Sequence, residues 1–446
     1  MKFLETLRNI WKINELRDRI IFTLIILAVY RFGAQIALPG IDVGGVSGLG
    51  SDAPGILGLL DAFTGGALAK ASVFALGIMP YISASIVVQL MGIAIPYLQK
   101  LQKEGASGQK KITQITRWLT IGICLLQAPA YLASLQFLGV SPESIDTQNL
   151  GYMFYFTSTI LLVTGCIFAM WLGEKITDKG IGNGISLLIT VGIIASLPQS
   201  FAQTITSRSA ADLEIMIIIE LVVWVVIILA CVMLVLAVRK IAVQYARRTT
   251  SGSFDRNTAG TRQYIPLRLN ASGVMPIIFA QALMFLPTTI GNALGSGNWF
   301  GRFLTENFVD MFGLYYNILF GLLIVVFTYF YTAITVPTNK IADDLKRSGG
   351  FIPGIRPGTD TSNLLDTIMS NITLPGSIFL ALVSVFPAFV VNYMGVQPGW
   401  AIFFGGTSLL IMVGVAIDTM QQINSYLLNK HYDGLMKAGR DRKPAI

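Results

Sequence analysis

Ten long apolar stretches, each about the length of a membrane-spanning helix, run through this 446-residue chain. About 20 apolar residues cross the roughly 30 Å hydrocarbon core at a rise of about 1.5 Å per residue. A mean hydropathy of +0.65 with only 13% charged residues excludes an ordinary soluble protein. The sequence therefore predicts an all-α polytopic membrane protein with ten transmembrane helices. These predicted spans cover residues 20–38, 71–92, 115–135, 153–172, 181–198, 213–237, 271–292, 312–336, 373–392 and 401–420.

The basic residues predict the orientation of the chain in the membrane. The termini and alternate connections hold 28 of the 32 Lys and Arg residues. Because short basic connections stay in the cytoplasm, both termini are expected there, with an amphipathic helix over 1–19 and a tail over 421–446. The net charge of +8 fits this topology and attraction to anionic lipids. A docking surface for an acidic partner is a second interpretation, and it is strongest for the long loop 239–268.

The residue inventory argues against an enzyme. His431 is the only histidine and lies in the predicted tail, so a histidine-dependent intramembrane protease is excluded. The sequence has no GxxxxGK[ST] phosphate loop, so the chain is not expected to hydrolyse nucleotides. The three cysteines lie singly inside predicted spans without metal-ligand spacing. We therefore expect no metal and no cofactor.

Three ionisable residues within the predicted spans keep a transporter under consideration. Ion-coupled carriers place charged groups near the membrane midplane. Arg31 and Asp418 lie close enough to span ends for their charges to reach the interface. Glu220 lies deeper in its span and could face either the bundle interior or the interface. An ion-coupled transporter with inverted repeats is thus the main alternative, and a non-transporting scaffold is a third.

The connection between the first two spans is unusual. After a glycine-rich stretch, residues 56–68 are apolar but too short to cross a membrane. They could form a re-entrant helix or an amphipathic helix on the outer surface. Ile78 and Ile82 in span 2 are four residues apart, as are Ile185 and Ile189 in span 5, so each pair shares one helix face. Such pairs are also ordinary on lipid-facing surfaces.

Several long motifs together resemble the SecY/Sec61-alpha family, whose bacterial members are channel subunits of the Sec protein translocase. The resemblance covers essentially the whole chain and keeps the family's order of spans. The motifs that carry it are residues 63–89, Trp171–Glu174 with Gly180–Ser186, Ser348–Gly358 and Phe404–Ile411.

The resemblance implies a protein-conducting channel of the bacterial inner membrane built from two inverted five-helix halves. Residues 20–200 form the half with spans 1–5, and residues 211–420 form the half with spans 6–10 and the cytoplasmic loops 239–268 and 340–363. The channel passes unfolded secretory proteins across the membrane and releases membrane segments sideways into lipid. It is passive, and the SecA motor or the ribosome drives transport.

The resemblance also assigns roles to individual residues. The pore ring consists of Ile78, Ile82, Ile185, Ile189, Ile278 and Ile411. The segment 56–68 becomes a re-entrant plug helix, with Leu57, Leu60, Phe63, Gly65 and Gly66 as its chief residues. The lateral gate, through which signal sequences and nascent membrane segments reach the lipids, includes Ser83, Ser85, Gln89, Pro276 and Gln281. Pro80 and Pro276 are expected inside the two gate helices, where they would bend them.

The basic loops then become docking sites for SecA or for ribosomal RNA phosphates. The docking residues are Arg239, Lys240, Arg247, Arg248, Lys346, Arg347 and Arg356. Arg356 is the best single candidate because the flanking prolines and glycines fix its direction. Residues 235–238 depart from the family pattern, which weakens the assignment at the base of the first loop. Small SecE-like and SecG-like membrane subunits complete the expected assembly.

Overall fold

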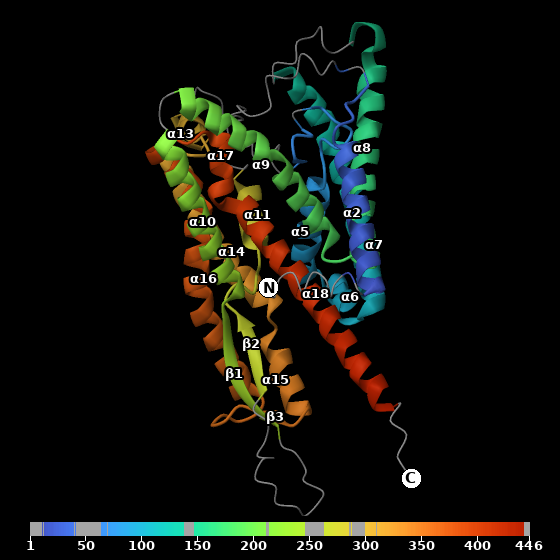
Figure 1. Ribbon diagram of the computed structural model, residues 1–446, viewed down its shortest axis with the longest axis vertical. Coiled ribbons are helices and arrows are strands. Elements are labelled where there is room, and N and C mark those ends of the chain that lie inside the picture. The colour runs from blue at the N-terminus through green and yellow to red at the C-terminus, as the bar shows by residue number, and fades with distance from the viewer. Residues whose placement is uncertain are drawn as a thin grey trace, which may run out of the picture. The chain divides into compact units, whose positions relative to one another are not determined.

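Helices make up most of the fold, and Figure 1 shows them coloured along the chain. The computed structural model describes residues 11, 13–39, 41, 64–68, 70–137, 147–210, 214–245, 263–284, 287, 299–308 and 310–440. Its contacts divide the chain into two compact units. Unit 1 comprises residues 1–211, 398–400 and 415–446, and unit 2 comprises residues 212–397 and 401–414.

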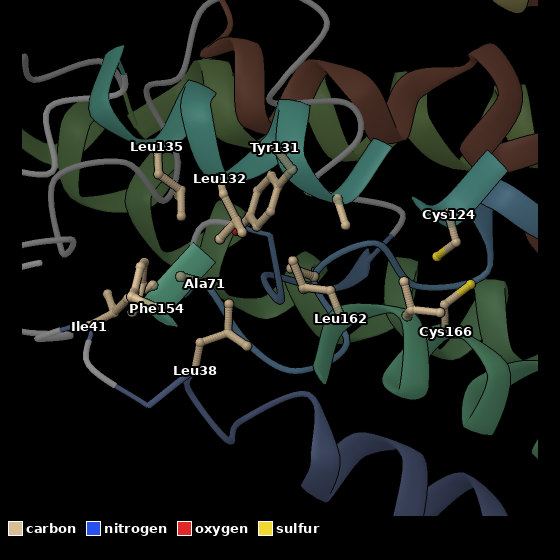
Figure 2. Close-up of a cluster of buried hydrophobic side chains, with 13 residues drawn as sticks. Leu38, Ile41, Ala71, Cys124, Tyr131, Leu132, Leu135, Phe154, Leu162 and Cys166 are labelled. Carbon is tan, nitrogen blue, oxygen red and sulfur yellow. The ribbon is translucent and has the colours of Figure 1, made fainter. Parts of the chain in front are cut away.

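The described residues of unit 1 include six helices and the later part of a seventh. They are α2 (Asn14–Gly33), α5 (Met79–Ala94), α6 (Pro96–Lys103), α7 (Ala106–Phe137), α8 (Thr147–Lys179), α9 (Gly184–Ala210) and the later part of α18 (Gly406–Arg440). One core, shown in Figure 2, joins α7 and α8 to the chain around Leu38 and Ala71. A second core joins α2, α8 and α9 around Tyr30 and Phe74.

Unit 2 combines helices with a small sheet. Its elements are α10 (Glu214–Leu236), β1 (Val238–Tyr245), β2 (Gln263–Arg268), α11 (Met275–Leu283), α13 (Trp299–Phe308), α14 (Leu314–Thr335), α15 (Thr338–Arg347), β3 (Gly350–Phe351), α16 (Thr359–Met394), the 3-10 turn η2 (Ile402–Phe404) and the start of α18. The short α17 (Pro398–Ala401) belongs to unit 1 except for its last residue. The long helix α14 packs along α16. In Figure 1 the sheet and α15 extend together past the ends of α10 and α14.

The predicted strictly helical fold is therefore wrong in one place. The predicted loop 239–268 contains two antiparallel strands, with Arg239 opposite Leu267 and Ile241 opposite Ile265. The second predicted loop contributes α15 and the strand β3, which pairs with the end of β1. Ile241 and Val243 alternate with more exposed residues, so one face of β1 is buried. Packing of this face favours strands in a segment that its many charged residues had indicated to be a loop.

Six described helices are long and apolar enough to cross a membrane, or seven if the bent pair α5 and α6 counts as one span. Ile215 and Ile218 on α10 are 75% and 64% exposed, an apolar surface typical of a helix inside a membrane. Helix α2 has the required length but carries Arg17, Asp18, Arg19 and Arg31. Most of the predicted span 271–292 beyond α11 lies outside the described residues. The chain is thus a multi-pass membrane protein, and the count of ten stays a prediction.

Two predicted boundaries differ from the structure. The predicted amphipathic helix over 1–19 is described only from residue 11, and its last part belongs to the continuous helix α2, which begins at Asn14. The second span was predicted from residue 71, but α5 begins at Met79. Residues 64–78, which we call the connector, are described except at residue 69, and the described ones form mainly turns instead of a regular helix, with left-handed backbone at Gly65, Gly66 and Gly77.

Candidate functional site

The two helices predicted to form the gate begin in the same way. Residues 77–82 read Gly-Ile-Met-Pro-Tyr-Ile and residues 273–278 read Gly-Val-Met-Pro-Ile-Ile. Gly77 has φ +52° and Gly273 has φ +64°, conformations in which glycine is favoured. Helix α5 starts at Met79 and α11 starts at Met275, each with proline in its first turn. This repeat was readable in the sequence, and it marks equivalent positions in the two units.

The predicted bend at the two prolines is therefore wrong. A proline inside a helix removes a hydrogen bond and clashes with the preceding turn. Pro80 and Pro276 instead occupy the first turn, where the backbone N–H has no helical acceptor and the fixed φ suits the helix. They define where α5 and α11 begin, and they leave no reason for a kink.

In unit 1 the structure brings three of the four predicted ring residues onto one core. Ile78 is only 4% exposed and belongs to the core around Tyr30. Ile82 and Ile185 are half-buried and pack against that core from α5 and α9. The Ile82 N–H donates to the Ile78 carbonyl at 3.1 Å, so both lie one turn apart as predicted from their spacing. Ile189 is half-buried one turn further along α9.

In unit 2 the remaining ring candidates lie on α11 and α18. Ile278 occupies in α11 the position that Ile82 occupies in α5, and it is half-buried. Ile411 lies in the first part of α18 and is 6% exposed. Each unit therefore presents isoleucine on the first turns of a proline-started helix.

The predicted gate residues lie on the same two helices. Ser83, Ser85 and Gln89 are half-buried along α5, and the Gln89 amide donates to the Ser85 hydroxyl at 3.3 Å. Pro276 is buried, and Gln281 is half-buried near the end of α11. These small and amide side chains can satisfy one another or meet a passing polar chain, which fits a surface between helices.

The predicted plug is described only at its end. Leu57, Leu60 and Phe63 lie outside the described residues. Gly65 and Gly66 are described, with φ of +67° and +83°. Both glycines thus belong to the turns of the connector that leads into α5.

A basic surface covers the sheet and the neighbouring α15 in unit 2. Beneath it lies an apolar core that includes Ile241, Leu267, Leu345, Ile352 and Leu365. The basic surface consists of the exposed residues Arg239, Lys240, Lys346, Arg347 and Arg356. Among the described residues, none of these five forms an ion pair within 4 Å. Arg247 and Arg248 lie outside the described residues.

Arg356 lies on a short loop whose backbone is held on both sides. Gly354 and Gly358 have φ of +83° and +117°, so both turns need glycine. The Thr361 hydroxyl donates to the Arg356 carbonyl at 2.9 Å, and the Ile355 N–H donates to the Ile352 carbonyl at 3.1 Å. The cationic side chain therefore extends from a fixed backbone, as the flanking glycines and prolines predicted.

The structure describes the three ionisable residues of the transporter hypothesis, Arg31 and Asp418 within unit 1 and Glu220 within unit 2. Glu220 is 2% exposed, so its carboxyl lies inside unit 2 instead of at the lipid surface. Asp418 is exposed on α18, and Arg31 contacts the connector. Among the described residues, no group of three or more His, Cys, Asp or Glu could hold a metal ion.

Comparison with known proteins identifies the family. The SecY family pattern matches residues 72–420. The chain is 38% identical to the protein translocase subunit SecY of Chlamydia trachomatis, over 98% of this chain and 99% of that protein. It is also 38% identical to the subunit of the same name from Escherichia coli, over 95% of each.

Solved structures show the same fold at low sequence identity. The chain resembles a structure of a protein conducting channel with a TM-score of 0.63 and 17% identity, over 91% of both chains. It resembles Sec61 from a canine ribosome-channel complex with a TM-score of 0.59 and 17% identity, over the same shares. From the matched family pattern and the nearly full-length identity, we conclude that this chain belongs to the SecY family of protein translocase subunits.

Proposed function

We propose that this chain is the pore-forming subunit of a bacterial protein translocase, a passive channel for unfolded polypeptides. It passes secretory proteins across the cytoplasmic membrane and releases membrane segments sideways into the lipid. The observation that carries the proposal is nearly full-length similarity to translocase subunits, combined with two isoleucine-bearing helices that begin alike in the two units. The chain itself is not an enzyme, because the translocase subunit of this family is a channel.

The proposed topology has ten spans in two inverted halves, residues 20–200 and 211–420. Both termini are cytoplasmic, because they carry Lys and Arg as the alternate basic connections do, and connections rich in Lys and Arg stay on the cytoplasmic side of a membrane. The repeated Gly-X-Met-Pro-X-Ile sequence supports two related halves. A re-entrant plug over 56–68 would close the outer side of the channel.

The seal is the ring of Ile78, Ile82, Ile185, Ile189, Ile278 and Ile411. Branched aliphatic side chains cannot replace the hydration shell of an ion, so a narrow ring of them gates by dewetting. They also form no specific hydrogen bonds, so the ring accepts polypeptides of any sequence. A seal of this kind combines low ion permeability with broad substrate acceptance.

The proposed lateral gate is formed by α5 and α11 with their neighbours α7 and α14, which pack against them within each unit. A signal sequence is an apolar helix, and it would exchange its contacts with α5 and α11 for lipid at little cost. Ser83, Ser85 and Gln89 give this surface polar groups that can pair with one another when the gate is closed. Small SecE-like and SecG-like subunits are the proposed membrane partners.

The basic surface is the proposed docking site for the driving partner. Arg239, Lys240, Lys346, Arg347 and Arg356 would bind ribosomal RNA phosphates or acidic groups of a SecA motor. The solved Sec61 structure comes from a ribosome-channel complex, which supports a ribosome as one partner. The proposed loop residues Arg247 and Arg248 extend the same charged region in the sequence.

Charge reversal at Arg356 tests the docking assignment. Arg356→Glu should abolish SecA-driven or ribosome-driven transport of a precursor in reconstituted vesicles while the complex assembles normally. Its matched control is Arg302→Glu, the same reversal at another exposed arginine, on α13. We expect the control to transport at the wild-type rate.

Undiminished transport by Arg356→Glu with both driving partners would refute the docking role. If wild-type vesicles fail to transport with either partner and with SecE-like and SecG-like subunits present, the channel function itself is wrong. Assembly is measured separately by co-purification of the subunits.

A further inference from the structure

Arg31 lies in the last turn of α2, inside the predicted first span, and its side chain binds the connector. The sequence places it close enough to a span end for its charge to reach the membrane interface. In the structure its Nη1 atom donates a hydrogen bond of 2.7 Å to the carbonyl of Gly65. A charged donor on a backbone carbonyl makes a stronger bond than a neutral pair. The contact joins α2 to a point 34 residues further along the chain.

Gly65 is confined at this point from two directions. A Cβ atom added there would lie 2.5 Å from Arg31 Nη1, 2.8 Å from the Gly192 carbonyl oxygen and 2.9 Å from Gly192 Cα. The φ of +67° also disfavours any residue with a side chain. Three segments, the end of α2, the connector and the middle of α9, therefore meet at Gly65.

The connector continues from this junction to the ring residue Ile78. Tyr30, next to Arg31, stacks on Phe74 with ring centroids 5.6 Å apart and planes inclined by 11°. Tyr30, Phe74 and Ile78 belong to one buried core. Near the end of the connector, a Cβ at Gly77 would lie 3.3 Å from Thr64, which directly precedes Gly65. The start and end of the connector thus lie close together, and Tyr30, Phe74 and Ile78 in one core link this region to the ring position.

The middle of the connector has its own support. The Leu38 N–H donates to the Ala71 carbonyl at 2.9 Å, and the Val73 N–H donates to the Ile36 carbonyl at 2.9 Å. The Tyr131 hydroxyl of α7 donates to the Leu68 carbonyl at 2.8 Å, and Figure 2 shows Tyr131 among the buried side chains around Ala71. Loss of the Arg31 bond should therefore release the Gly65 junction without unfolding the connector.

We propose that Arg31 is a positioning residue for the channel seal. Its bond to Gly65 holds the connector against α2 and α9 and so fixes Ile78 where the ring needs it. This inference rests on the proposed channel function and adds a residue that the ring assignment does not contain. A charged group within a membrane helix is costly unless it is paired, and the Gly65 carbonyl gives Arg31 such a partner.

The test measures ion leak through the resting translocase complex. Vesicles loaded with potassium chloride and containing the purified complex are diluted, and potassium release is followed with an electrode in the absence of precursor. Arg31→Met, which keeps an unbranched apolar stem but removes the charged donor, should increase the leak about tenfold, the effect of losing one hydrogen bond from a charged group. Arg31→Lys, which keeps a charged donor, should restore at least part of the seal.

Lys70→Met is the matched control. Lys70 lies on the same connector, and its Nζ donates to Gln35 Oε1 at 2.7 Å, so the substitution removes one cation and one hydrogen bond to the chain just after α2. That pair is exposed and lies outside the Gly65 junction. We expect Lys70→Met to be as tight as wild type. An equal leak in both variants would mean that loss of charge, not the junction, opens the seal.

Transport of a precursor in the same vesicles separates this inference from the proposed function. If wild type and Arg31→Met both transport and both remain equally tight, the role of Arg31 is refuted while the channel function stands. If wild type does not transport, the function is refuted. Thermal unfolding of the complex shows whether Arg31→Met leaks only because the fold is weakened. The positioning role would be overturned by two results together: a large drop in the melting temperature of Arg31→Met, and a leak that is no smaller in Arg31→Lys.

Discussion

Leu365→Ala should loosen the sheet that carries the basic surface while the membrane-embedded helices stay intact. Leu365 lies near the start of α16, is 1% exposed, and belongs to the apolar core with Ile241, Val243 and Leu267. Truncating a fully buried leucine costs about 2–5 kcal/mol through lost burial and the cavity that remains. This core is the main apolar contact between the three-stranded sheet and the helices α15 and α16. We expect the local stability of the sheet to absorb most of that cost.

Hydrogen exchange measures this effect directly. A loss of about 3 kcal/mol corresponds to roughly a 100-fold increase in the open population. The backbone amides of β1 (238–245) should therefore exchange about 100-fold faster in the Leu365→Ala complex. Leu382→Ala on the same helix is the control, because Leu382 is 65% exposed and should leave β1 unchanged.

Unchanged exchange in β1, or an equal acceleration in Leu382→Ala, would refute the assignment of Leu365 as a support of the basic surface. The experiment also separates two routes to lost docking. Arg356→Glu removes the charge from an intact surface, whereas Leu365→Ala weakens the surface that presents it.

Three further predictions concern other elements. Pro80→Ala and Pro276→Ala should each lower the free energy of unfolding by about 1–2 kcal/mol, because both prolines are buried and lose apolar ring atoms, while a first-turn proline sacrifices no helical N–H bond; a gain near 3 kcal/mol in thermal unfolding of the complex would restore the interior-kink interpretation. Glu174→Gln should destabilise the complex by about 1 kcal/mol, because it removes the carboxylate that Arg117 binds at 2.6 Å and Arg117 is half exposed; an unchanged melting temperature would contradict this. Arg239→Gln should reduce the salt slope of ribosome binding to vesicles by about 1, and an unaltered slope would exclude a phosphate contact there.

The membrane class and the order of elements could be predicted from the sequence because bilayer thickness fixes the length of an apolar span. The runs over 213–237 and 312–336 became α10 and α14 almost as predicted. For such segments the lipid, not a specific neighbour, decides which residues form the helix.

The start of the second span could not be found from hydropathy. Residues 71–78 are as apolar as a helix would be, yet they belong to the connector, because Gly77 with its positive φ and backbone hydrogen bonds to the chain just after α2 favour turns. The motif Gly-X-Met-Pro, repeated at residues 273–276, was the available signal for both helix starts. The first residue of such a helix is therefore better predicted from a first-turn proline than from the edge of an apolar run.

The long-range contacts were beyond sequence reasoning. Nothing near Arg31 in the sequence indicates that its acceptor is the carbonyl of Gly65, because backbone acceptors have no side-chain signature. The pairing of β1 with β2 and β3 likewise depends on a core supplied by α15 and α16. In contrast, the fixed backbone around Arg356 was readable from its glycines and prolines.

Crosslinking from the predicted ring to a translocating chain tests the central claim most directly. With Cys124, Cys166 and Cys231 replaced by serine or alanine, single cysteines are placed at Ile82, Ile278 and Ile411, and at the exposed control Ile218 on α10. A secretory precursor is then arrested midway through the complex. The channel account predicts adducts with the precursor at all three ring positions and none at Ile218; adducts at Ile218 without any at the ring would contradict it.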